Sequence, residues 1–246
     1  MRPLTLITVL SMLMYFSSCV PTWQYITLDS REVTKDTLKA FVWENDTLEL
    51  IYCFNGYGGP IRMSITNKMD KPMYINWKKS ALIDRGNAAS LYQTNVQMSG
   101  AFVSGTQRSY FTSPRSYTTS GSIAGSFSLP EGMDFIPPHS NISKSLDLVV
   151  SGPVARDHLT GSPESLKATR KGVGTNSYKL YTYEASSSPV QFKTYLTFLM
   201  DGDNAKEFSV SHTFYASKIM TGSYSPRFFI PYEKEGDMLY VIQKKQ

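Results

Sequence analysis

Cysteine and histidine are scarce in this sequence, which narrows the chemistry that it can support. The 246 residues include two cysteines and three histidines. Two cysteines are too few for a disulfide framework. His139, His158 and His212 lack the four-residue spacing by which a helix presents zinc ligands. We therefore predict no metal site.

Recognisable catalytic motifs are also missing. The sequence has no G-x-S-x-G elbow, no P-loop and no dinucleotide fingerprint. The sequence therefore does not support a serine hydrolase of the commonest architecture or the binding of a nucleotide cofactor. A dispersed carboxylate pair, as glycoside hydrolases use, stays open because such residues meet only in three dimensions. We predict a non-enzymatic protein without a cofactor, and rank a hydrolase third among the candidate functions.

Charged residues are few, at 18% of the chain, and the formal net charge is +5. No run of Lys and Arg is long enough to track a nucleic-acid backbone, so no nucleic-acid partner is expected. The mild positive excess suits anionic lipid headgroups or acidic glycans.

What the sequence does contain begins with a secretion signal. Arg2 precedes an apolar run over residues 4–16, which is too short to span a bilayer, and two serines then precede Cys19. This resembles a lipobox, with Phe16 where leucine is usual. We predict a lipoprotein signal peptide over residues 1–18, a lipid on Cys19 and hence membrane attachment, and a short tether over 19–23.

The second cysteine, Cys53, lies in the apolar run 50–54. No basic residue beside it would lower the pKa of its thiol. We interpret it as a small buried residue in a strand rather than a reactive thiol.

Residues 24–246 are predicted to form one all-β domain, an antiparallel Ig-like β-sandwich with long loops. Apolar and polar residues alternate at Ile61, Met63 and Ile65, as in a half-buried strand. Turn residues separate runs of this kind at roughly ten-residue spacing, which favours a sandwich. The expected strands cover residues 23–28, 39–43, 47–54, 61–66, 73–83, 91–98, 134–136, 143–150, 178–183, 192–199, 208–219 and 238–243.

Two short segments need separate interpretation. Ser162, Pro163 and Glu164 suit the start of a helix, so one two-turn helix is predicted over residues 162–171. The acidic segment 201–204 superficially resembles a calcium loop but lacks the closing glutamate of an EF-hand. A hairpin turn is the better interpretation.

Residues 99–128 are rich in Ser, Thr, Gly and Tyr. A flexible segment or a pair of weak strands is favoured there over a functional loop. Aromatic and basic side chains interleave within it and would suit stacking on sugars or contact with an anionic partner, although they equally suit packing of the loop on the sheet. These candidate contact residues are Arg108, Tyr110, Phe111, Arg115 and Tyr117.

Several runs resemble uncharacterised envelope lipoproteins of the Bacteroidota. They are Glu44-Asn45, residues 48–53, Gly58-Gly59, residues 65–68 with Asp70-Lys71-Pro72, Tyr74-Ile75, Lys79-Ser80, and the stretches 192–198 and 208–219. The resemblance covers about two thirds of the chain. It implies a lipid-anchored β-sandwich and assigns no activity or catalytic residue.

Two further features are interpreted in that light. Asp36-Thr37-Leu38 and Asp46-Thr47-Leu48 match a short pattern similar to the O-glycosylation acceptor of Bacteroidota envelope proteins, which makes Thr37 and Thr47 candidate acceptors. No acidic run follows Cys19, whereas one resembling a surface-export signal is typical of exported members. A periplasm-facing anchor in the outer membrane is therefore favoured.

Together these observations predict a lipid-anchored interaction or accessory subunit of an outer-membrane complex, with an envelope protein as partner. Sheet edges and loops would supply the binding surface. The alternative is a surface glycan-binding lipoprotein of a polysaccharide-uptake system.

Overall fold

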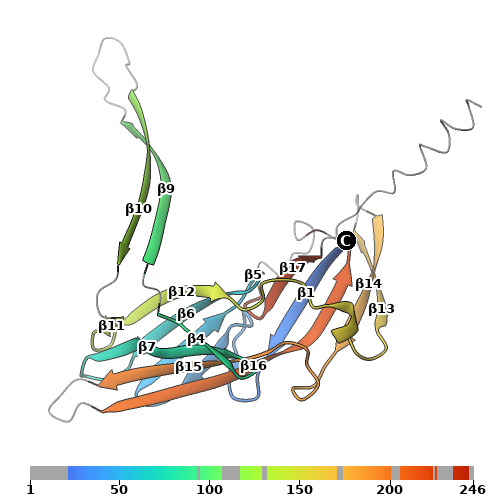
Figure 1. Cartoon of the computed structure of the whole chain (residues 1–246), viewed down its shortest axis with the longest axis horizontal. Helices are drawn as coiled ribbons and strands as arrows, with labels where there is room; N and C mark the ends of the chain where they lie inside the picture. Colours follow the sequence, from blue (N-terminus) through green and yellow to red (C-terminus); the bar gives the residue numbers. More distant parts are fainter. Residues whose placement is uncertain are drawn as a thin grey trace, which may run out of the picture. The chain divides into compact units, whose positions relative to one another are not determined.

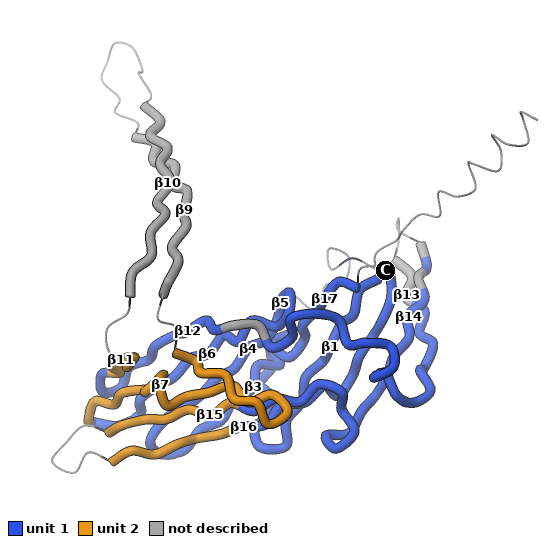
Figure 2. Tube along the Cα trace, in the orientation of Figure 1, with its two compact units in different colours: residues 1–70, 137–193, 212–246 blue, residues 71–136, 194–211 orange. Residues whose placement is uncertain are grey.

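The predicted all-β, sandwich-like fold is confirmed by a computed structural model of the chain (Figure 1). The structure describes residues 22–92, 95–106, 117–128, 132–170, 174–200, 206–223, 225 and 235–243. These residues hold no α-helix, and therefore no helix able to cross a bilayer. The chain forms two compact units, which Figure 2 colours separately. Unit 1 comprises residues 1–70, 137–193 and 212–246, and unit 2 comprises residues 71–136 and 194–211.

Unit 1 contains a five-stranded antiparallel sheet in the order β12-β6-β4-β3-β2. Its members are β12 (Asn141–Leu148), β6 (Pro60–Asn67), β4 (Leu48–Cys53), β3 (Phe41–Glu44) and β2 (Thr34–Lys35). The predicted alternation in β6 is confirmed, because Ile61, Met63 and Ile65 are all buried. Their side chains point to one face, as the period of a strand requires.

The other strands of unit 1 are arranged around β1 (Thr22–Asp29), which pairs with β16 (Glu207–Gly222) on one side and β17 (Met238–Gln243) on the other. Beyond β16 come β14 (Gly174–Thr182) and then β13 (Glu164–Arg170), and β5 (Gly56–Tyr57) pairs with β17 in parallel. Figure 1 shows β1, in blue, alongside β16.

An aromatic core joins the two groups of strands within unit 1. The ring centroid of Phe214 on β16 lies 5.1 Å from that of Phe41 on β3 and 5.3 Å from that of Tyr52 on β4. Phe54 and Phe192 lie 5.0 Å and 5.3 Å from the same ring. The ring of Phe192 is stacked on that of Phe214 and the other three contacts are edge-on, and both arrangements are favourable between aromatic rings at these distances. The core of unit 1 is therefore built from residues of both sheets.

Unit 2 contains β7 (Met73–Asp84), β8 (Asn87–Ser90), β11 (Met133–Ile136) and most of β15 (Gln191–Met200). Its sheet runs in the order β11-β7-β15-β16, with β8 on β7. Arg85 and Gly86 both have positive φ, the geometry of a two-residue hairpin turn between β7 and β8. Met200 N donates to Lys206 O at 3.1 Å between β15 and β16. The predicted turn at 201–204 lies outside the described residues.

Two strands occupy the segment rich in Ser, Thr and Gly. β9 (Asn95–Thr106) and β10 (Tyr117–Ser128) pair antiparallel along their whole length. The strand predicted over 91–98 therefore begins later, at Asn95, and extends further. Residues 107–116 between the strands lie outside the described residues.

The helix predicted over residues 162–171 is wrong, because Glu164–Arg170 forms β13. Leu166 lies opposite the buried Tyr178 of β14, and the whole of β13 is hydrogen-bonded to that strand. A helix of two turns is marginal by itself, whereas a neighbouring strand satisfies the backbone along the full segment. The described residues contain one helical turn, the 3-10 turn Arg156–His158.

Candidate functional site

A cavity of about 410 Å³ lies in unit 1 at the end of the sheet where β1 begins. We call it the β1 groove. Its volume falls within the range of small-ligand sites. Thr22 and Gln243 line it from β1 and β17, Thr221, Gly222 and Ser223 from β16 and its end, Ser177, Tyr178, Lys179 and Tyr181 from β14, Ser165 from β13, and Arg156 and Leu159 from the segment before β13.

Strand register explains why these residues meet. Ser165, Lys179 and Thr221 are successive cross-strand partners on β13, β14 and β16, so they form one row. Thr221 is in turn opposite Gln24 on β1. Residues paired in this way project on the same face of a sheet. The row therefore forms a polar floor at the edge of the domain.

One wall of the groove is attached by a buried glutamine. The Gln24 side chain is fully buried; its Nε2 donates to Val154 O and its Oε1 accepts from Val154 N, both at 2.8 Å. These two bonds hold the segment that continues into the 3-10 turn and brings Arg156 and Leu159 to the groove. Gln24 thus acts as a positioning residue. Buried amides need such partners, because leaving them unpaired costs free energy.

A glycine lies next to the floor, on the opposite face of the sheet. A Cβ atom at Gly222 would lie 2.4 Å from Cδ1 of Tyr178, much closer than van der Waals contact allows. Tyr178 is buried and lies on β14 beside Lys179. Gly222 therefore permits the close packing of β16 on the tyrosine ring that lines the groove.

The charge of the β1 groove is positive. Arg156 and Lys179 line it, and among the described residues that line it none carries a carboxylate. The hydroxyls of Ser165, Ser177 and Thr221 add hydrogen-bond donors along the floor. This set of side chains suits an anionic group with several acceptor oxygens.

None of the described residues that line this groove was predicted from the sequence as a site residue. Cys19 lies outside the described residues, as do Arg108, Tyr110, Phe111 and Arg115. Tyr117 is the first residue of β10, and its side chain is not among those described. The structure therefore does not test a contact surface built from these side chains.

The two threonines proposed as glycosylation acceptors differ in exposure. Thr37 is exposed, in the turn where Asp36 Oδ1 accepts from the backbone N of Leu38 and Ala40. Thr47 is half-buried, and its backbone N donates to Asn45 Oδ1 at 2.8 Å. This bond belongs to the turn between β3 and β4. Thr37 is the more accessible hydroxyl.

Cys53 is half-buried rather than buried, because it lies on the outward face of β4. Its Sγ donates to Asn55 Oδ1 at 3.0 Å. Cys53 and Arg62 belong to a second, shallow hollow of about 450 Å³ on the outer face of β4, β6 and β12. Arg62 is also bonded to Asn55, so the thiol and the guanidinium of this hollow share Asn55 as a partner.

No three metal-ligating side chains cluster among the residues that the structure describes. His139 pairs with Asp70 at 2.7 Å on the surface, and His158 lies 3.9 Å from Asp157. His212 is buried in β16, with Nδ1 3.0 Å from Tyr52 Oη and its ring 5.1 Å from that of Trp43. Its neighbours are those of a core residue.

The environment of His212 predicts a pH dependence of stability. Burial lowers the pKa of His212 below its ordinary 6.5, and the nearby Glu32 carboxylate opposes this only partly. Just below pH 6.5 the imidazole is therefore protonated in the unfolded chain but not in the folded chain. The contribution of His212 to the free energy of unfolding is complete above that pH and falls as the pH drops toward the lowered pKa. Denaturant unfolding between pH 7.5 and 5 should show this loss.

Comparison of two variants isolates the contribution of this imidazole. The His212→Gln protein should lose less stability over the same pH interval, because it has no imidazole to protonate on unfolding. His158→Gln, which removes an exposed histidine, should keep the wild-type slope. An unchanged slope in His212→Gln would show that another group causes the loss.

Known proteins give no guide to the groove: no protein-family model matches the chain, and neither a curated protein nor a solved structure does so.

Proposed function

We propose that the chain is a lipid-anchored, non-enzymatic protein of the bacterial outer membrane, where it serves as an interaction or accessory subunit of an envelope complex. The observation that supports this most is the start of the folded domain. β1 begins at Thr22, three residues after Cys19, and is hydrogen-bonded on both sides. A lipid on Cys19 would therefore attach directly to a strand fixed inside the sheet.

The length of this connection sets the distance of the domain from the bilayer. Three residues span at most about 11 Å when fully extended. The end of unit 1 that carries Thr22 would lie at the headgroups, within reach of a membrane-embedded partner. A long flexible tether would instead let the domain sample space far from the membrane.

The anchor is tested by removing the thiol that carries it. The Cys19→Ala protein is expected to incorporate no labelled fatty acid and to leave the membrane fraction, because no other thioether acceptor lies at the predicted cleavage site. Cys53→Ala is the matched control and should stay lipidated, since Cys53 lies within β4. Unchanged fractionation of Cys19→Ala would refute the anchor.

The accessory role is tested on the native protein. Mild-detergent purification from membranes with mass spectrometry should recover an outer-membrane protein, and the chain should resist protease added to intact cells. Recovery of the chain alone together with rapid proteolysis would contradict this role. That pattern would favour the alternative, a surface glycan-binding lipoprotein, for which the hydroxyl-lined β1 groove is the candidate site.

A further inference from the structure

We propose that the β1 groove binds the phosphate-bearing headgroup of an anionic membrane lipid, with Arg156 and Lys179 as the residues that recognise the phosphate. This inference rests on the proposed lipid anchor, because the anchor is what would bring the groove to the bilayer. The inference goes beyond the anchor, because a lipid on Cys19 could hold the chain at the membrane without any ligand in the groove.

The β1 groove lies next to the predicted lipid anchor. Thr22 is both a lining residue of the groove and the first residue of β1. The groove would therefore lie within about 11 Å of the lipid-bearing Cys19. Headgroups of the bilayer occupy that distance, so their local concentration at the groove would be far above that of any soluble anion.

Two cationic side chains line the β1 groove. Lys179 lies in the polar row on the sheet and Arg156 in the 3-10 turn before β13, so two cations from separate segments line one cavity. Asp157 and Glu164 lie near in sequence, but neither lines the groove. An arginine fork and a lysine ammonium are the side chains that commonly bind phosphate oxygens.

The backbone segments that carry Arg156 and Lys179 are both held in place. Gln24 holds the Arg156 segment by two hydrogen bonds to Val154, and the register of β13, β14 and β16 fixes Lys179. The two cations are thus attached to a rigid frame, which lowers the entropy cost of binding. The mixed polar and apolar lining, including Leu159, also suits a headgroup together with its glycerol.

A neutral glycan fits the groove less well. Sugar rings stack on exposed aromatic faces. Of the two tyrosines that line the groove, Tyr178 is 3% exposed and packs against Gly222, and Tyr181 is half-buried. The two cations would have no counterpart on a neutral sugar. An acidic oligosaccharide shares the anionic chemistry and is therefore one outcome of the test.

The test uses the full-length protein, purified in a non-ionic detergent from whichever cell fraction holds it. Isothermal titration calorimetry compares dihexanoyl phosphatidylglycerol, dihexanoyl phosphatidylcholine, inorganic phosphate and trigalacturonate. Lys179→Gln and Arg156→Gln should each weaken phosphatidylglycerol binding about fivefold, the effect of one cation at an anionic headgroup. Lys218→Gln is the matched control: Lys218 lies on β16, three positions from Thr221 and thus on the other sheet face, and should bind as the unmodified protein does.

Each outcome decides the proposal. Tighter binding of phosphatidylglycerol than of phosphatidylcholine, with loss in both groove variants alone, supports it. Equal binding of the two lipids, no binding, or a loss in Lys218→Gln as large as in the groove variants overturns it. Inorganic phosphate binding as tightly as the lipid would assign the site to free phosphate, and preferential trigalacturonate binding to a glycan. The titration does not depend on where the chain resides, so it fails independently of the Cys19→Ala fractionation.

Discussion

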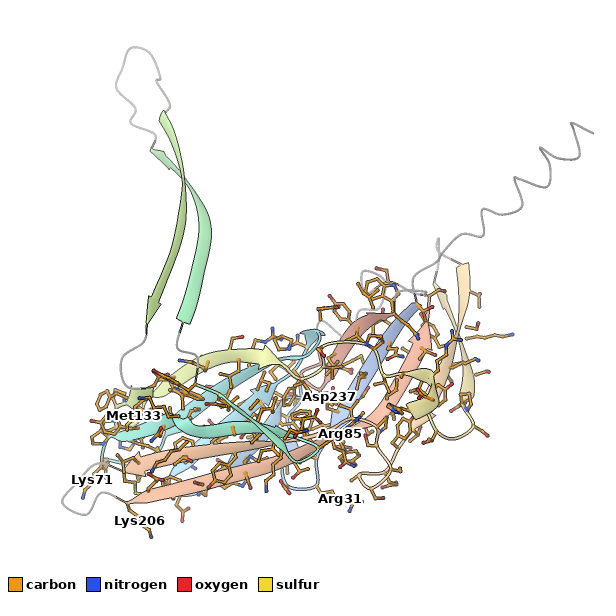
Figure 3. The ribbon with its side chains drawn as sticks, in the orientation of Figure 1. Arg31, Lys71, Arg85, Met133, Lys206 and Asp237 are labelled. Carbon is orange, nitrogen blue, oxygen red and sulfur yellow. The ribbon has the colours of Figure 1, made fainter. Side chains whose placement is uncertain are left out.

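The Lys35→Met protein is expected to be less stable than the unmodified protein by about 3 kcal/mol, because the substitution leaves the buried carboxylate of Asp237 without a cation. Lys35 Nζ lies 2.7 Å from Asp237 Oδ2, and Asp237 is 3% exposed. Figure 3 labels Asp237, which immediately precedes β17. The other carboxylate oxygen, Oδ1, has no hydrogen-bond partner among the described residues. Lys35 is therefore the main group that compensates this buried charge.

Other contacts of Lys35 add to the expected loss. Its Nζ also donates to Leu28 O at 2.7 Å and lies 4.9 Å from the centre of the Phe41 ring. These contacts connect β2 to β1 and to β3. Methionine keeps much of the apolar stem of lysine, so the measured change reports the ammonium group rather than a cavity.

Chemical denaturation of three variants separates pairing from burial. Lys79→Met removes the cation of an exposed pair, Lys79 Nζ to Glu207 Oε2 at 2.6 Å, and should cost about 1 kcal/mol or less. The double variant Lys35→Met/Asp237→Leu should regain part of the stability lost in Lys35→Met, because it removes the buried charge as well. Equal loss in Lys35→Met and Lys79→Met would mean that burial of Asp237 has no effect.

Sequence patterning predicted the strands well where one face of a strand packs on a core. The strand at 238–243 has the predicted bounds, and β4 and β6 differ from prediction by one residue at each end. Burial of Leu48, Leu50 and Tyr52 alternates along β4 with less buried neighbours, as period two requires. Alternation of this kind is local, so it can be recognised without knowledge of the partner strand.

Prediction failed where the deciding contact is distant in sequence. The polar segment 162–171 has good helix-start residues, yet β14 provides it with a hydrogen-bonded neighbour and it becomes β13. The β1 groove was missed for the same reason. Arg156 and Lys179 carry no shared motif, and only the register of β13, β14 and β16 brings their segments together.

One local signal for the groove was present in the sequence. Gln24 occupies the same strand face as Ile26 and Leu28, both of which are fully buried. A glutamine among buried aliphatic positions needs hydrogen-bond partners inside the fold. It therefore pointed to a backbone segment covering the start of β1, although not to residue 154 as the partner, which lies 130 residues away.

Truncation of Phe214 to alanine is expected to have the largest effect, a loss of about 4 kcal/mol in the free energy of unfolding. The Phe214 side chain is fully buried, and its ring contacts four others, those of Phe41, Tyr52, Phe54 and Phe192. These rings come from β3, β4 and β15 as well as from the segment after β4. The cavity would therefore open where the sheets of unit 1 meet, and fixed strands on both sides would limit its collapse.

The matched control is Phe135→Ala. Phe135 lies on β11 with half of its side-chain surface exposed, at 51%, and contacts the ring of Tyr74. Its loss should cost less than about 1 kcal/mol, because little apolar area returns to water. Urea unfolding followed by tryptophan fluorescence measures both variants. Similar losses in Phe214→Ala and Phe135→Ala would show that the aromatic cluster of unit 1 is not the centre of its stability.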